Sequence, residues 1–259
     1  MGLSKHAVEF LFASFVLTLF FCGGSISIIS DGAVATGGLP HVFTDGFANT
    51  GFHEFTSGNA YQVSLGTNHS GDLIVVILTE SYENASGYYN SSRVSSIHDT
   101  ANLNWHTRLN KFNAIDSGYP AMFYAYSKIS LANDQITLKT SASSTQYELT
   151  AFAIHGVVSF DSSHSLPAVS LGMPSPTPKI SFKTSKGGEV ILAYISPDHV
   201  YTDSIAYPRN YIPITIENTG HWFYLAFKVV GPSATSLTQK WSLSPADNYG
   251  IMGDAMTRG

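Results

Sequence analysis

Residues 72–81 read DLIVVILTES, and this stretch decides the fold class. The six positions 73–78 are all apolar, and four of them are Val or Ile, which are enriched in strands. A strand that is apolar on both faces is usually covered by protein on both sides. The stretch therefore predicts a central strand of a sheet that is buried on both faces.

Similar short runs fill the chain beyond residue 30. They are rich in Val, Ile, Thr, Tyr and Phe, are bounded by Gly, Pro, Asn, Asp and Ser, and do not keep the apolar spacing of a helix. Ile136 and Leu138 alternate with Thr137 and Lys139, as in a strand with one buried face. Strands are predicted at 59–66, 72–81, 93–97, 103–109, 121–129, 135–141, 146–156, 178–184, 189–196, 210–216, 221–230, 238–244 and 248–257. The expected fold class is all-β, an antiparallel β-sandwich.

The body of the chain contains an internal sequence repeat. The segment from Gly71 to Val76 matches the segment from Gly188 to Ala193, Phe123-Tyr124 matches Phe223-Tyr224, and YELTAFAI at 147–154 matches YGIMGDAM at 249–256. We expect one domain over 59–259, built from related halves at 59–156 and 178–257. The interval between the first two matches is longer in the first half, which predicts an inserted surface loop there.

The first 27 residues have the layout of an export signal. Lys5 and His6 precede an apolar run at 7–22, and Gly-Gly-Ser follows. The run is shorter than the ~20 residues that span a bilayer as a helix. We expect an extracellular or cell-surface location, with cleavage after Gly24 or Ser27. A buried core helix, lipid attachment at Cys22, and a pilin-type leader that stays as an apolar N-terminal helix are the alternatives.

The composition excludes several kinds of partner. Only 12% of residues are charged, and the net charge is −5 with no basic run, so neither nucleic acid nor anionic lipid is expected as a partner. The membrane would be contacted only through the N-terminal segment before processing. Cys22 is the sole cysteine, so the body has no disulfide and is held by its core and its strand ladders.

Three Asn-x-Ser acceptors lie close together, at Asn68, Asn84 and Asn90, and the last two fall in the longer interval of the first half. Together with the export signal they predict N-glycosylation. Three tyrosines share this region, namely Tyr82, Tyr88 and Tyr89. These tyrosines could instead stack on sugars or contact a protein neighbour, since tyrosine is enriched at interfaces.

No pattern of catalytic or cofactor-binding residues emerges, and neither a catalytic residue, a metal nor a cofactor is predicted. His98, Asp99 and His106 form the densest group of possible ligands, but their spacing matches no zinc signature. We expect Asp99 to hold a turn through its side-chain acceptor and Trp105 to pack in the core. Calcium at the loop acids Asp72, Asp99, Asp134 and Asp203 stays open.

A family resemblance rests on the segment DTANLNWHTR at 99–108, together with 71–81, 122–129, 136–156 and 251–256. The segment is similar to the D-x-A-G/N-L-x-W-x-x-R motif of exported β-sandwich proteins of archaeal and bacterial cell surfaces, filaments and phage. The resemblance covers about residues 59–257 and implies a jelly-roll-like sandwich and a surface location. By analogy with surface threads and pili whose subunits exchange a strand, it also implies a filament subunit.

A possible donor strand precedes the body. Residues 25–36 are β-prone and are separated from the body by Gly-Gly and a loop-like stretch. The segment begins in the last residues of the leader at 1–27 and continues into the strand or linker region expected at 28–58. After export this segment could pair with a neighbour's sheet edge or form an ordinary first strand. The donor residues would be Ser25, Ile26, Ser27, Ile28 and Ile29.

We therefore expect a non-enzymatic structural subunit of an extracellular filament or surface layer, whose partners are copies of itself. The alternative is an adhesive module that binds surface glycans through exposed Tyr and Trp. A hydrolase with an unrecognised site is the third hypothesis.

Overall fold

In the computed structural model of the chain, the described residues are 41–54, 58–83, 89–90, 94–110, 120–141, 146–197, 204–214, 223–233 and 235–259. Within these ranges the secondary structure is strand only, and every strand pair is antiparallel. The described part of the chain contains no helix with the length and hydropathy needed to cross a membrane. The expected all-β, antiparallel class is confirmed. The leader at 1–27 lies outside the described residues.

Residues 43–155 form two sheets. The larger sheet has the strand order β1 (Phe43–Asn49), β10 (Gln146–His155), β4 (Asp72–Glu83), β8 (Ala121–Ser127) and β7 (His106–Leu109). Two short strands extend it, because β2 (His53–Glu54) pairs with β10 and β5 (Tyr89–Asn90) pairs with β4. The smaller sheet has the order β3 (Ala60–Leu65), β9 (Asp134–Thr140) and β6 (Val94–Asp99).

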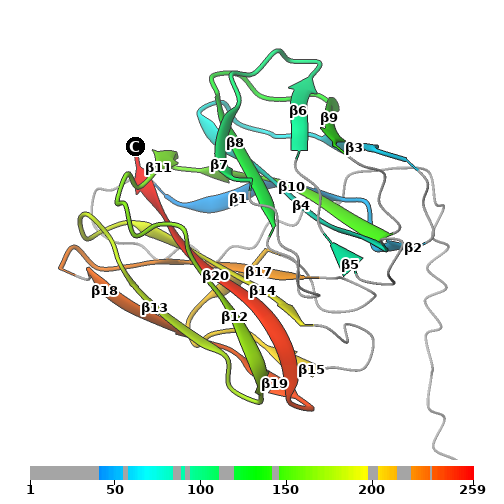
Figure 1. The fold of residues 1–259 in the computed structure, drawn as a ribbon. Coiled ribbons are helices and arrows are strands. Elements are labelled where there is room, and N and C mark those ends of the chain that lie inside the picture. Colours follow the sequence, from blue (N-terminus) through cyan, green and yellow to red (C-terminus); the bar gives the residue numbers. More distant parts are fainter. Residues whose placement is uncertain are drawn as a thin grey trace, which may run out of the picture.

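Residues 157–258 form a second set of sheets. The larger sheet has the order β11 (Val157–Phe160), β20 (Asp247–Arg258), β14 (Val190–Pro197), β17 (Tyr224–Val229) and β16 (Ile212–Pro213), and β12 (Ala168–Ser175) also pairs with β20. Beside it, β13 (Lys179–Lys183) pairs with β18 (Ser236–Lys240), and β15 (Ser204–Ala206) pairs with β19 (Ser242–Ser244). Figure 1 shows the first set of strands, blue to green, above the second set, which ends in red at the C-terminus.

Three apolar cores lie between these sheets, and β4 contributes to two of them. Its side chains alternate, so that Leu73, Val75 and Ile77 face the core shared with β14 and β20. Ile74, Val76 and Leu78 face the core under β3 and β9. All six are at most 1% exposed, so the predicted central strand with two covered faces is confirmed.

The alternation repeats on β14. Val190, Leu192 and Tyr194 enter the core between the two sets of strands. The intervening residues enter a third core with Trp241, which is fully buried between β18 and β19. The larger sheets therefore pack face to face, and each smaller sheet covers the outer face of one of them.

Each predicted strand range contains a strand of the structure, but several strands were missed. β1 lies in the stretch expected to be loop-like, and β11, β12 and β15 were also not predicted. β1 contains Asp45 and Gly46, and β12 contains Gly172 and Pro174, residues that are depleted in strands. Pairing with β10 and β20 outweighs these local preferences.

Candidate functional site

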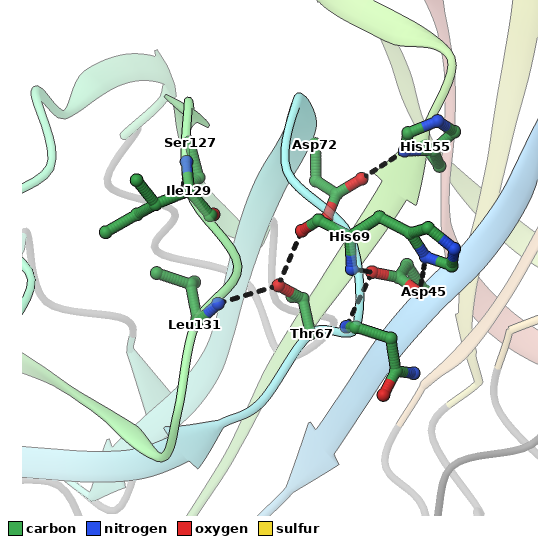
Figure 2. Close-up of polar contacts among 9 residues, drawn as sticks. Asp45, Thr67, His69, Asp72, Ser127, Ile129, Leu131 and His155 are labelled. Carbon is green, nitrogen blue, oxygen red and sulfur yellow. Dashed lines mark hydrogen bonds and ion pairs between the residues drawn. The ribbon is translucent and has the colours of Figure 1, made fainter.

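The link between β3 and β4 forms a tight loop at one end of the first half. Thr67 binds Leu131 twice, because its amide donates to the Leu131 carbonyl at 2.9 Å and its Oγ1 accepts the Leu131 amide at 2.9 Å. The Thr67 hydroxyl in turn donates to the His69 carbonyl at 3.2 Å. The loop is thereby fixed against the segment between β8 and β9 (Figure 2).

Asp45 of β1 lies beneath this loop and is only 5% exposed. Its Oδ2 accepts the amides of Asn68 and His69 at 2.8 and 2.7 Å, and its Oδ1 accepts the His69 Nδ1 proton at 2.7 Å. Burial raises the pKa of Asp45, but the hydrogen bonds from His69 outweigh burial, so the pKa lies below its usual value. Asp45 is therefore an ionised carboxylate with three donors.

Asp72, the first residue of β4, faces Asp45 and is fully buried. Its Oδ1 accepts the His155 Nδ1 proton at 2.7 Å (Figure 2). Burial raises the pKa of Asp72 to about 6, and the neighbouring Asp45 carboxylate adds to the rise, while His155 opposes it. The two aspartates thus have pKa values displaced in opposite directions.

Rings cover this carboxyl pair on its outer side. The ring centroids of His69 and His155 are 5.2 Å apart, and Phe43 stacks on His155 at 5.0 Å. The His69 and His155 side chains are 53% and 29% exposed, whereas both aspartates are buried. Solvent therefore meets the imidazoles first, and the carboxyls lie below them.

The second half contains a corresponding carboxyl pair. Asp161 accepts the amides of Ser163 and Ser185 at 2.7 and 2.6 Å, and Glu189 is fully buried beside it. Burial raises the pKa of Asp161, but these amides outweigh burial and its pKa lies below its usual value. Burial raises the pKa of Glu189 to about 7, with Asp161 adding to the rise and Lys186 opposing it.

The loops above the two pairs also correspond. TNHSGD at 67–72 aligns with TSKGGE at 184–189, and in both the Thr hydroxyl donates to the carbonyl two residues later, at 3.2 and 2.7 Å. Gly71 and Gly188 have φ of 83° and 78°, values that glycine adopts readily. Both glycine amides donate to carbonyls at the end of a neighbouring strand, Ser127 and Gly231 respectively.

A carboxyl and an imidazole in contact can exchange a proton, which is the basic operation of acid–base chemistry. Here the carboxyls are buried. Asp45 and Asp161 each hold a loop in place through hydrogen bonds from backbone amides. Among the described residues, no three or more His, Cys, Asp or Glu side chains group as metal ligands.

His98, Asp99 and His106, the densest group of possible ligands in the sequence, do not group as metal ligands in the structure. His98 and His106 are exposed, while Asp99 accepts the Leu103 amide at 3.1 Å and the Trp105 indole proton. The expectation that Asp99 holds a turn is therefore confirmed. Trp105 is half-buried and packs against the core of the first half.

The predicted modification and contact residues are only partly described. Asn68 is exposed, at the top of the loop over Asp45. The backbones of Tyr82 and Asn90 pair across the β4–β5 hairpin, and that of Tyr89 pairs with Glu83. Asn84 and Tyr88 lie outside the described residues, as does the predicted donor strand of Ser25, Ile26, Ser27, Ile28 and Ile29.

Four residues at these pairs were not expected from the sequence to be part of a site, namely Asp45, His155, Asp161 and Glu189. The available signal was the repeated Thr-x-x-x-Gly-acid pattern at 67–72 and 184–189, of which only the Gly-acid part was noted.

Comparison of the chain with protein-family models, with curated proteins and with solved structures found no match. A proposal about function therefore rests on the residues and the geometry above.

Proposed function

We propose that this chain is a structural subunit of an extracellular filament or surface layer that assembles with copies of itself. The export-like leader at 1–27 and the acceptors at Asn68, Asn84 and Asn90 support a location outside the cytoplasm. The resemblance of residues 99–108 to exported surface sandwiches supports the same reading. In this role the protein is not an enzyme.

The fold we propose is a pair of jelly-roll-like sandwiches that arose by duplication. The central trio β10-β4-β8 corresponds to β20-β14-β17. The sheet β3-β9-β6 corresponds to the two pairs β13-β18 and β15-β19, with β18 and β19 together in the place of β9. In each half a larger antiparallel sheet faces smaller ones, and this arrangement supports a jelly-roll-like sandwich, which is built from two packed sheets. The paired loops at 67–72 and 184–189 support the duplication.

The observation that carries the proposal is the position of β1. β1 is an end strand of its sheet, and among the described residues it pairs with β10 alone. Backbone groups on the free side of an end strand can pair with a strand from another chain. The β-prone segment 25–36 lies six residues before β1 in the sequence, so one subunit can offer a strand and the next an edge.

Contacts between the halves suit a subunit that carries load without disulfides. Arg108 of β7 binds Asp254 of β20, and Tyr194 of β14 is hydrogen-bonded to Thr79 of β4. These polar links cross a continuous apolar interface between the larger sheets. A pull on one half is thereby transmitted to the other through many contacts at once.

Substitution within the donor segment tests the proposal. Ile26 and Ile28 share one face of an extended segment, while Ser25 and Ser27 share the other. Replacing Ile26 and Ile28 by Asp puts two charges on the face that would be buried against a neighbour. Electron microscopy of surface material and light scattering of the purified protein then measure assembly.

The matched control replaces Ser25 and Ser27 by Asp, which adds the same charge to the opposite face. We expect filaments or sheets from the unmodified chain and from the control, and dispersed subunits from the isoleucine variant. Dispersed monomers from the unmodified chain would refute the structural function. Assembly that persists in the isoleucine variant would refute strand exchange but keep the function.

A cluster of rings favours one second candidate, a carbohydrate-binding surface module. His53 stacks on Tyr147 with centroids 4.8 Å apart and an interplanar angle of 13°, and Tyr147 contacts Tyr61 at 4.4 Å. These rings lie at the end of β10 that pairs with β4 near Ser81, beside the hairpin that carries Tyr89. Flat rings of this kind can stack on sugars.

Glycan-array binding tests this candidate. Replacing Tyr88 and Tyr89 by Ala should abolish binding if the hairpin holds a sugar. Tyr126 is 39% exposed at the opposite end of the sheet, so Tyr126→Ala is the matched control and should bind as the unmodified chain does. No binding by the unmodified chain would remove this candidate.

A further inference from the structure

Four buried carboxyl oxygens of the described residues have no hydrogen-bond partner. One is Oδ2 of Asp134, whose Oδ1 accepts the Thr100 hydroxyl and the Ala101 amide. The other three belong to two residues, Asp72 (Oδ2) and Glu189 (both side-chain oxygens). Both residues are fully buried, and an ionised carboxylate in that situation would forfeit its hydration without compensation. Both residues also stand at the same place in the two halves, directly after a glycine with positive φ.

Each of these residues faces a carboxylate that is already supplied with donors. Asp45 accepts three hydrogen bonds from nitrogen donors, two of them backbone amides. Asp161 accepts two hydrogen bonds from backbone amides. Asp45 and Asp161 are therefore the ionised members. The Asp45 carboxylate raises the pKa of Asp72, and the Asp161 carboxylate raises that of Glu189. The buried oxygens of Asp72 and Glu189 that lack a donor can meet these carboxylates favourably only if each pair holds a proton.

We propose that the folded protein binds two protons that the unfolded chain releases, one shared between Asp72 and Asp45 and one shared between Glu189 and Asp161. Each shared proton closes one end of a sandwich, because it joins β1 or the segment after β11 to the start of the central strand. Because of these two protons, the folded state loses stability as the pH rises.

The groups that face each pair are few. Two histidines face the first pair. His155 of β10 donates a hydrogen bond from Nδ1 to Asp72, and His69 of the 67–71 loop donates one from Nδ1 to Asp45. The positive charge of Lys186 opposes protonation of Glu189, but burial outweighs it. Arg108 and Asp254 act on the second pair through Asp161.

The direction of the pH dependence follows from the displaced pKa values. The pKa of Asp72 rises to about 6 and that of Glu189 to about 7 on folding. Between the unfolded and the folded pKa, the folded state holds one more proton per group. The folding equilibrium constant therefore falls about tenfold per pH unit per group across that window and levels off above pH ~7. Asp45 and Asp161 act oppositely, since their contribution is lost below pH ~4.

Asp72→Asn and Glu189→Gln test the proposal in the full chain. An amide N–H imitates the shared proton at every pH, so each variant should gain stability relative to the unmodified chain as pH rises. We expect the folding equilibrium constant of each variant, divided by that of the unmodified chain, to grow at least about tenfold between pH 4.5 and pH 8. Denaturant unfolding at a series of pH values measures this ratio, and Asp254 affects both chains equally.

The matched controls are Asp45→Asn and Asp161→Asn, which remove the ionised acceptor and should lose stability above pH ~4. Infrared spectroscopy of the unmodified chain gives a readout that needs no variant to fold. The carbonyl stretch of protonated carboxylic acids should be present at pH 5. It should weaken near pH 6, where both Asp72 and Asp254 lose a proton, and disappear near pH 7, where Glu189 does. A missing band at pH 5, or a stability ratio that does not change with pH, would overturn the proposal.

Discussion

The guanidinium of Arg108, in the first half, forms two hydrogen bonds with the carboxylate of Asp254, in the second half. The N–O distances are 2.9 and 2.7 Å, Asp254 is fully buried, and the Arg108 side chain is 13% exposed. Arg108 also lies over the Phe160 ring, 5.1 Å from its centroid. Burial raises the pKa of Asp254 to about 6 although Arg108 opposes the rise, so both partners are charged at neutral pH.

Breaking this pair should be costly. Arg108→Ala leaves the Asp254 carboxylate buried without its partner, and we expect a loss of about 3–5 kcal/mol in the free energy of unfolding at pH 7.5. Below pH ~6 Asp254 can take up a proton, so the loss should shrink. Urea unfolding at pH 7.5 and pH 5 measures both values.

Two controls make the Arg108 experiment specific. Arg209 is exposed, and Arg209→Ala should change stability by less than about 0.5 kcal/mol. Replacing Arg108 by Met and Asp254 by Leu together should recover most of the loss, because no charge is then left buried. An equal loss at both pH values would show that the effect comes from packing and not from the charge of Asp254.

Much of the fold could be predicted from the sequence, because the apolar pattern of a strand is visible in its own few residues. The run at 73–78 is apolar at every position and is buried on both faces. β1 could not be predicted in the same way, since Asp45 and Gly46 weaken its strand pattern. Their presence is explained only by the distant residues they meet, Asp45 by the 67–71 loop and Gly46 by the Gly66 carbonyl.

The candidate site was harder to predict for the same reason. Asp72 was noted as the start of a strand and as a possible calcium ligand, but its partners Asp45 and His155 come from strands far along the chain. No spacing rule links these three positions. The repeat of the Gly-acid pair at 71–72 and 188–189 was visible in the sequence. The structure adds that each of these acids is buried near a second carboxylate, that of Asp45 or Asp161.

The hydrogen bond between Thr79 and Tyr194 is a second polar link between the halves. The two hydroxyl oxygens are 3.1 Å apart, and both side chains are fully buried. Tyr194→Phe should lower the free energy of unfolding by about 0.5–1.5 kcal/mol, since it removes one hydrogen bond and keeps the ring. Tyr194→Ala should cost about 3–5 kcal/mol, because it also empties part of the core.

A double-mutant cycle with Thr79→Val measures the pairwise contribution of this bond. We expect a coupling energy of about 1 kcal/mol between Thr79→Val and Tyr194→Phe. Tyr126→Phe, at a ring that is 39% exposed, is the control and should be nearly neutral. Additive single effects would mean that the two hydroxyls do not interact in solution.

Glycines beside the two carboxyl pairs should resist substitution. A Cβ added at Gly46 would lie 2.2 Å from the Gly66 carbonyl oxygen, and one at Gly187 would lie 1.9 Å from the Pro232 carbonyl oxygen. Both obstacles are backbone, so the strand or loop must shift. We expect Gly46→Ala and Gly187→Ala each to cost at least about 1–3 kcal/mol.

Gly58 provides the matched control for these substitutions. A Cβ there meets nothing within 4 Å, so Gly58→Ala should change the free energy of unfolding by less than about 1 kcal/mol. Thermal or denaturant unfolding compares the three variants. Tolerance of Ala at Gly46 would mean that β1 does not approach the Gly66 carbonyl as closely as described.

Asn68 offers the most direct test of export and modification. Its side chain is exposed, and only its backbone amide holds Asp45, so the side chain can carry a glycan without loss of that bond. In a host that glycosylates exported Asn-x-Ser sites, Asn68→Gln should reduce the mass of the secreted protein by one glycan. Because the backbone amide remains, its stability after enzymatic deglycosylation should match that of the deglycosylated unmodified chain to within about 0.5 kcal/mol. Mass spectrometry of the intact protein and of its peptides gives the result, and an unmodified Asn68 peptide in the secreted chain would contradict the prediction.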